Sequence, residues 1–161
     1  MVESSDFVFL IAAIPFSFSE SQSPGSSVVF FGIIPSTVEL SITETNNTFD
    51  FENALIDPTA EGLQIATWSF STPSGNATIQ LTAQPLSSAE SDDTIGFSLT
   101  FVNPYGNIVL DVDSSTGGQA TKVFSGSDPI SSENQDVLFK LDKAYDAAVG
   151  SYSTTVYVEI S

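Results

Sequence analysis

Apolar and polar residues alternate with a period of two along much of this chain. In the segment 77–84, apolar residues occupy every second position, and Thr or Gln fills the positions between them. The same pattern recurs in the segments 38–43, 66–71, 95–101, 108–113 and 152–160. Successive side chains of a β-strand point to opposite faces, so this alternation predicts strands with one buried face. Two further runs, 7–14 and 28–34, are apolar at nearly every position, as in strands covered from both sides.

Short clusters of Gly, Pro, Asn, Asp and Ser separate these runs. The clusters lie at 23–25, 46–47, 57–58, 73–76, 103–106, 117–118 and 126–129. Because these residue types favour turns, the pattern is one of many short strands joined by tight connections. We therefore expect an all-β fold, an Ig-like antiparallel β-sandwich of Greek-key or jelly-roll type.

At most one short helix is expected in this fold. Its apolar residues fall at i, i+3, i+4 and i+7, and a Gly follows as a stop signal: Leu141, Ala144, Tyr145, Ala148 and Gly150. No repeat or linker interrupts the chain, and 161 residues are enough for one hydrophobic core. Residues 1–161 are therefore interpreted as a single domain.

Composition excludes most familiar enzyme chemistries. The chain contains neither His nor Cys. It therefore lacks an imidazole base, a thiolate nucleophile, a disulfide and the usual ligands of zinc or iron–sulfur centres. We expect a protein that is not an enzyme, with no catalytic residues and no cofactor.

The charge balance argues against nucleic acid and anionic membranes as partners. Three Lys, no Arg and 20 Asp and Glu give a formal net charge of −17, which would repel nucleic acid and anionic lipid. The run 7–14 is too short to span a membrane, and Glu3 and Asp6 precede it where a signal peptide has Lys or Arg. We interpret this run as part of the folded protein, and the Ser- and Thr-rich composition favours an extracellular or cell-surface location.

Carboxylates are the main groups left for acid–base chemistry or metal binding. Asp111 and Asp113 lie two residues apart and so share one strand face, ahead of Gly117 and Gly118. An oxygen-rich turn of this kind suits Ca²⁺, and a pair of carboxylates suits glycoside hydrolysis, for which Glu90, Asp92 and Asp93 are further candidates. The simpler interpretation is a solvated strand face followed by a hairpin turn, and we expect no metal.

Two other groups of residues allow surface functions. Asn46 and Asn76 each begin an Asn-x-Thr sequon in a predicted turn and are candidates for glycosylation. Trp68 and Tyr105 are the aromatic residues that a carbohydrate-binding module could use to stack on sugars, although the alternation around Trp68 favours burial.

The strands carry little of the protection that open sheet edges usually have. Lys is absent from the first 121 residues, and the predicted strands contain no internal Pro. The candidate subunit interface is the apolar run near the N-terminus, which consists of Phe7, Val8, Phe9, Leu10, Ile11, Ala12, Ala13 and Ile14. We expect residues 1–20 to supply a strand donated to a neighbouring copy, with 21–27 as a polar hinge. The alternative, that this run is the first strand of its own domain, stays open.

The C-terminal segment resembles a known family. Gly150-Ser151-Tyr152 leads into an alternating run that ends the chain at Val158-Glu159-Ile160, and this is similar to the closing strand of pilin and spore-coat-U-like domains. The resemblance implies a sandwich that polymerises on the cell surface by donor-strand exchange, without the cysteine pair that many such pilins carry.

The leading hypothesis is therefore a structural subunit of an extracellular filament or pilus, whose partners are copies of itself. The alternatives are a monomeric adhesin or carbohydrate-binding module that contacts glycans or a host surface, and a viral or phage capsid or fibre protein.

Overall fold

The computed structural model describes residues 7–9, 25–34, 39–44, 62–141 and 150–161. These residues form strands joined by turns, and no helix occurs among them. The strands are β1 (Phe7–Phe9), β2 (Gly25–Ile34), β3 (Glu39–Glu44), β4 (Leu63–Thr72), β5 (Ala77–Ala83), β6 (Leu86–Ser88), β7 (Thr94–Ile95), β8 (Phe97–Phe101), β9 (Ile108–Val112), β10 (Gly118–Phe124), β11 (Ile130–Leu141) and β12 (Ser151–Ile160). The predicted all-β class is confirmed. Of the expected short helix, Leu141 ends β11 and residues 142–149 lie outside the described residues.

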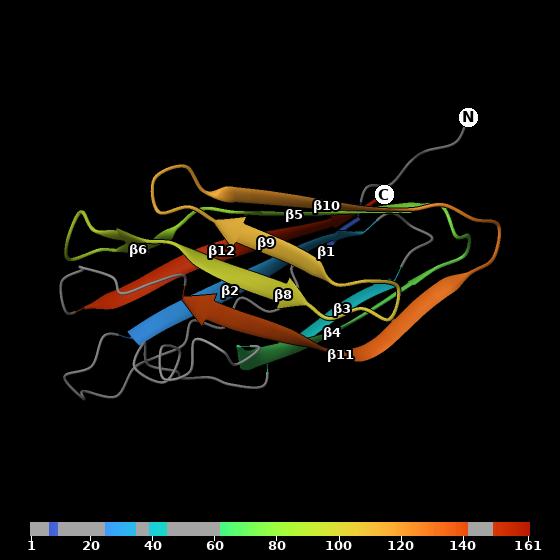
Figure 1. Ribbon diagram of the computed structural model, residues 1–161, viewed down its shortest axis with the longest axis horizontal. Helices are drawn as coiled ribbons and strands as arrows, with labels where there is room; N and C mark the ends of the chain where they lie inside the picture. Colours follow the sequence, from blue (N-terminus) through green and yellow to red (C-terminus); the bar gives the residue numbers. More distant parts are fainter. Residues whose placement is uncertain (1–6, 10–24, 35–38, 45–61, 142–149) are drawn as a thin grey trace.

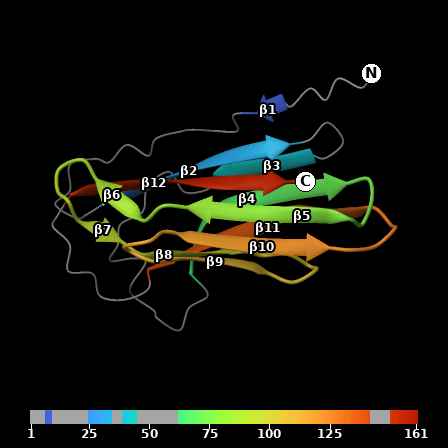
Figure 2. The same ribbon diagram turned by 90° about the horizontal axis from the view of Figure 1, so that it is seen from above.

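Two sheets pack face to face as a sandwich (Figures 1 and 2). The first has the strand order β1-β2-β12-β5-β10, and the short strands β6 and β7 extend it beside β12. The second has the order β3-β4-β11-β8-β9. Among the described strands, every pairing is antiparallel except that of β2 with β12, which is parallel. The sandwich is therefore as expected, with one parallel pairing that local sequence patterns did not predict.

The alternating segments place one apolar face of each strand in the core. In β5, every second residue from Ala77 to Ala83 is buried, and in β12 every second residue from Tyr152 to Ile160 is buried. Aromatic rings fill the centre, where Phe97 stacks on Phe139 with ring centroids 5.5 Å apart. Burial of each large apolar side chain contributes about 1.5–3 kcal/mol, so this alternation is the main source of stability.

Departures from the alternation coincide with irregular pairing. In β4, Ile65 and Ala66 are consecutive and both buried, because the pairing with β11 shifts register between Val137 and Leu138. The predicted strand 95–101 is likewise divided at Gly96, so that β7 joins the first sheet and β8 the second. A Cβ at Gly96 would lie 2.7 Å from the carbonyl oxygen of Val112, so only Gly fits at this crossing between sheets.

Candidate functional site

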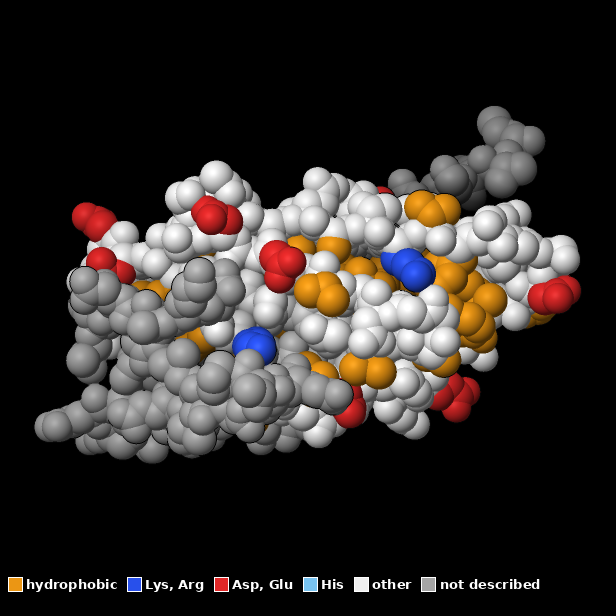
Figure 3. All heavy atoms as spheres, viewed as in Figure 1, with side chains coloured by type: hydrophobic (Ala, Val, Ile, Leu, Met, Phe, Trp, Pro, Cys, Tyr) orange, Lys and Arg blue, Asp and Glu red, His pale blue; other side chains and the backbone are white. Residues whose placement is uncertain are grey.

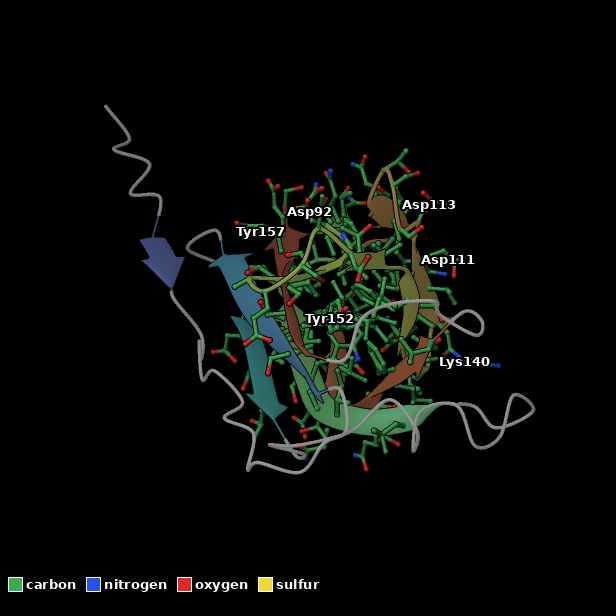
Figure 4. All side chains as sticks on the ribbon, turned by 90° about the vertical axis from the view of Figure 1, so that its left-hand side faces the viewer. Asp92, Asp111, Asp113, Lys140, Tyr152 and Tyr157 are labelled. Carbon is green, nitrogen blue, oxygen red and sulfur yellow. The ribbon has the colours of Figure 1, made fainter. Side chains whose placement is uncertain are left out.

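The candidate interface begins with β1, which lies at the outer margin of the first sheet. Phe7 lies opposite Ile34, Val8 opposite Ile33 and Phe9 opposite Gly32, all in antiparallel register. Figures 2 and 4 show β1 beyond β2, on the side away from β12. Thus three of the eight candidate interface residues form a strand that pairs with their own chain, and 10–14 lie outside the described residues.

The edge of β2 that β1 occupies is longer than β1. On one side, Gly25 to Ile33 pair with Ser151 to Glu159 of β12. On the other side, Gly32 to Ile34 pair with β1, and within the described part of the chain no strand pairs with 25–31 there. The segment 25–34 contains no charged residue and no Pro. This edge therefore offers main-chain groups for strand pairing without a residue that opposes it.

The expected hinge needs a correction. Residues 25–27 are not a hinge, because β2 begins at Gly25 and pairs with β12 from its first residue. The remaining part, 21–24, lies outside the described residues. The polar residues 25–27 form a strand because strand pairing uses main-chain groups, and these pair with Ser151 to Ser153 of β12.

Lys122, on the opposite edge of the same sheet, is a residue that sequence reasoning missed. It lies opposite Ile79, which is fully buried, so its side chain starts on the inner face of the sheet. The neighbours at two-residue spacing, Ala120 and Phe124, pack against the hydrophobic core. The Lys122 ammonium lies 5.9 Å from the centroid of the Phe124 ring. The alternation in 118–124 places Lys122 on the face of Phe124, and that signal could have identified it.

The candidate calcium residues are arranged as a strand face and a turn. Asp111 is exposed on β9 and Asp113 follows this strand, with both side chains directed away from the core in Figure 4. Asp113 Oδ1 accepts hydrogen bonds from the Ser115 hydroxyl at 2.5 Å and the Ser115 N–H at 2.8 Å, and also from the Thr116 N–H at 3.2 Å. Gly117, at φ 78°, closes the turn through backbone hydrogen bonds with Asp113. Asp113 thus caps its own turn; a turn was expected at this place, but not this role of Asp113.

These hydrogen bonds also change the titration of Asp113. The hydroxyl of Ser115 is the largest influence that lowers the pKa of this carboxyl from its ordinary value of 3.8, followed by the Ser115 N–H. Both donors stabilise the ionised form, because a carboxylate accepts hydrogen bonds more strongly than a neutral acid does.

The other candidate carboxylates do not join this turn. Asp93 Oδ2 accepts a hydrogen bond from the Ser91 hydroxyl at 3.2 Å, within the loop that holds Glu90 and Asp92. Figure 4 shows Asp92 apart from both Asp111 and Asp113 around the rim of the sandwich. No group of three acidic side chains that could hold a metal ion occurs in the described ranges.

The two aromatic candidates occupy different environments. Trp68 is a core residue, 1% exposed, stacked on Phe70 with ring centroids 5.0 Å apart. Its burial removes it as a sugar platform. Tyr105, in the loop between β8 and β9, is 47% exposed, and its hydroxyl donates to the carbonyl oxygen of Ser131 at 3.3 Å.

Of the two sequons, one can be placed. Asn76 is exposed in the turn between β4 and β5, and its side-chain oxygen accepts a hydrogen bond from the Gly126 N–H at 3.1 Å. Asn46 lies outside the described residues.

The outer side of the second sheet has a shallow hollow of about 140 Å³ over β3, β4 and β11. Its lining residues are mostly Ser and Glu: Glu39, Leu40, Ser41, Ser69, Phe70, Ser71, Ser131, Ser132 and Glu133. Leu40 and Phe70 add apolar surface to this hollow, and no catalytic groups converge in it.

The part of the chain that the structure describes has no helix with the length and apolarity needed to cross a membrane. Comparisons of the chain with protein-family models, with curated proteins and with solved structures found no match.

Proposed function

We propose that this protein is a structural, pilin-like subunit of an extracellular filament in which the strand near the N-terminus of one copy pairs with β2 of the next copy. The donated residues are Phe7 to Ile14, and the acceptor is the outer edge of β2. The chain then acts as a building block whose partners are copies of itself.

The observation that carries this proposal is the position of β1 at the margin of the first sheet. β1 pairs through only three residues with the end of β2, and the rest of that edge pairs with no strand among the described residues. A marginal strand that makes all its pairings with one neighbour can make the same pairings with another copy, as in domain swapping. In such an exchange, the backbone hydrogen bonds between β1 and β2 form between two copies instead of within one, and no other kind of contact is required.

The sequence of the donated segment supports the proposal. Residues 7–14 are apolar throughout, and the acceptor 25–34 is uncharged. Two such strands can pair without burying an unpartnered charge, which would be costly. The contact is heterologous, because strand and edge are different surfaces, so it extends into a filament when each copy donates to a new neighbour and the rotation between copies does not close a ring.

Electron microscopy of the intact chain with two matched variants tests the proposal. Val8→Asp puts a charge in the middle of β1, whereas Val109→Asp makes the same change at a half-exposed position of β9. We expect filaments from the unaltered chain and from Val109→Asp, and single subunits from Val8→Asp. An unaltered chain that runs only as a 17.0 kDa monomer at high concentration would contradict the proposal.

A further inference from the structure

We propose that residues 10–14 continue the pairing of β1 along the edge of β2 in an unbroken register, so that the donor strand covers 7–14 and ends at Pro15. This inference deepens the proposed function, because it names the acceptor residue within 27–34 that each donor residue meets. It rests on the proposed strand donation for the copy that supplies the strand, whereas the register applies whichever copy supplies it.

The pairing of β1 fixes the register of the residues that follow it. Phe7 lies opposite Ile34, and Phe9 lies opposite Gly32. In an antiparallel ladder without a bulge, each step forward along one strand is a step back along its partner. The continued register pairs Leu10 with Phe31, Ile11 with Phe30, Ala12 with Val29, Ala13 with Val28 and Ile14 with Ser27.

The apolar runs of donor and acceptor have matching ends in this register. The donor run 7–14 begins after Asp6 and ends before Pro15, and the apolar part of β2 is 28–34. The continued register aligns the two runs to within one residue. It leaves both Asp6 and Pro15 outside the ladder, so every donor position within it carries an apolar side chain and a main-chain N–H.

Registers shifted by two residues keep the same faces together but fit less well. A shift in one direction places Asp6 opposite Ile33, which brings a carboxylate into an apolar ladder. A shift in the other direction places Pro15 opposite Val28, which removes a hydrogen-bond donor from the ladder. The sequences of both strands therefore favour the register that β1 already has.

The register also decides which donor residues belong to the core face. Val28 and Phe30 of β2 are buried, with at most 1% of either residue exposed. Directly opposite residues of an antiparallel pair lie on the same face of the sheet. Ile11 and Ala13 therefore belong to the core face of the donor strand. The outward positions are Leu10, Ala12 and Ile14.

The other margin of the first sheet offers no comparable edge. There β10 lies against β9, since a bridge between Asp113 and Gly117 joins the end of β9 to the start of β10. A Cβ at Gly118 would overlap the carbonyl oxygen of Asp111. Figure 3 shows the described side chains over β9 and β10 as one continuous surface. Of the two margins of the strand order β1-β2-β12-β5-β10, the β2 side is thus the one with main-chain groups left to pair among the described residues.

Disulfide cross-linking of the intact chain tests the register, because the chain has no Cys of its own. Ala12→Cys is combined in turn with Val29→Cys, Ser27→Cys and Phe31→Cys. Position 29 is the predicted partner, and 27 and 31 are two residues away on the same face. Directly opposite residues have Cα atoms about 4.5–5.5 Å apart, within reach of a disulfide, whereas diagonal neighbours at about 7–8 Å are not.

Under limiting oxidant, we expect Ala12→Cys/Val29→Cys to give about ten times the disulfide yield of either mismatched pair. Ile14→Cys/Ser27→Cys, the last predicted pair, should react as well. Val8→Cys/Ile33→Cys is the reference, because these residues pair in the structure. Mass spectrometry of peptides identifies the linked positions, and circular dichroism shows whether each variant is folded.

Equal yields from the three Ala12 pairs, or a higher yield from a mismatched pair, would overturn the inference. So would a failure of both predicted pairs while the reference pair reacts. The size of the linked product answers a separate question: closed monomers linked in the predicted register contradict strand donation and leave the register intact, whereas multimers linked in this register agree with both. Failure of the reference pair would overturn both, because β1 would then not pair with β2.

Discussion

The indole N–H of Trp68 donates a hydrogen bond to the carbonyl oxygen of Val102 at 2.8 Å, which joins β4 to the residue that follows β8. The same ring stacks on Phe70 and meets Phe101 edge to face at 5.3 Å. The only Trp of the chain therefore connects strands inside the second sheet, and its function is structural.

Trp68→Ala is expected to destabilise the fold by about 4 kcal/mol, since it removes a fully buried aromatic side chain and leaves a cavity. Denaturant unfolding followed by circular dichroism measures this change. Tyr105→Ala is the control, with an expected loss of about 1 kcal/mol, because this ring is half exposed and makes one edge-to-face contact with Phe124. A stable Trp68→Ala variant that lost only glycan binding would favour the carbohydrate-binding alternative.

Ser115→Ala is expected to raise the pKa of Asp113 towards 3.8, because it removes the hydroxyl that lowers this pKa most. In the unaltered chain the folded-state pKa lies below the unfolded one, so the ionised carboxylate stabilises the fold above pH 3.8, and this contribution is lost as the pH falls through the folded-state pKa. The thermal midpoint of Ser115→Ala should therefore lie below that of the unaltered chain at neutral pH and approach it in acid.

Carbon NMR of the Asp113 carboxyl group measures the pKa directly. Ser114→Ala, a neighbouring exposed position in the same turn, is the control and should leave the titration unchanged. Identical Asp113 titrations in the unaltered chain and in Ser115→Ala would show that the Ser115 hydroxyl does not donate a hydrogen bond that stabilises the ionised Asp113 carboxylate.

Gly118→Ala is expected to destabilise the fold by about 3 kcal/mol, because its Cβ would overlap the carbonyl oxygen of Asp111 where the chain crosses from β9 to β10. Gly126→Ala is the matched control. A Cβ there would have Gly75 Cα as its nearest neighbour at 3.9 Å, so the expected change is within about 0.5 kcal/mol. Equal unfolding free energies for the two variants would be inconsistent with the close approach of β9 and β10.

The alternation predicted the sandwich because burial of one strand face is a local pattern. It located β5 and β12 and indicated the burial of Trp68. It did not predict β10, where Lys122 occupies an inner-face position, or β11, where two residues, Glu133 and Asn134, oppose the single residue Ser69 of β4 and interrupt the period. A bulge of this kind depends on the neighbouring strand, which the local pattern does not contain.

The local sequence pattern also could not predict which distant strands pair with each other. The parallel pairing of β2 with β12 joins segments more than a hundred positions apart. Because of this pairing, residues 25–27 form part of a strand, whereas the sequence had predicted a hinge there. A solvated strand face followed by a hairpin turn was predicted as the simpler interpretation, whereas the hydrogen bonds from Ser115 and Thr116 to Asp113 required the geometry. Whether β1 is donated stays a prediction.

Cysteine substitution at Val8 and Ile33 tests the central claim most directly. These residues lie opposite each other across β1 and β2, and the chain has no Cys of its own. In the variant Val8→Cys/Ile33→Cys, strand donation predicts oxidation to a ladder of covalent multimers on a non-reducing gel. A mixture of the two single variants, Val8→Cys and Ile33→Cys, should then form a heterodimer with a disulfide between the two substituted positions. Oxidation of the double variant to closed monomers alone, with no heterodimer from the mixture, would show that β1 pairs within its own chain and would contradict the account.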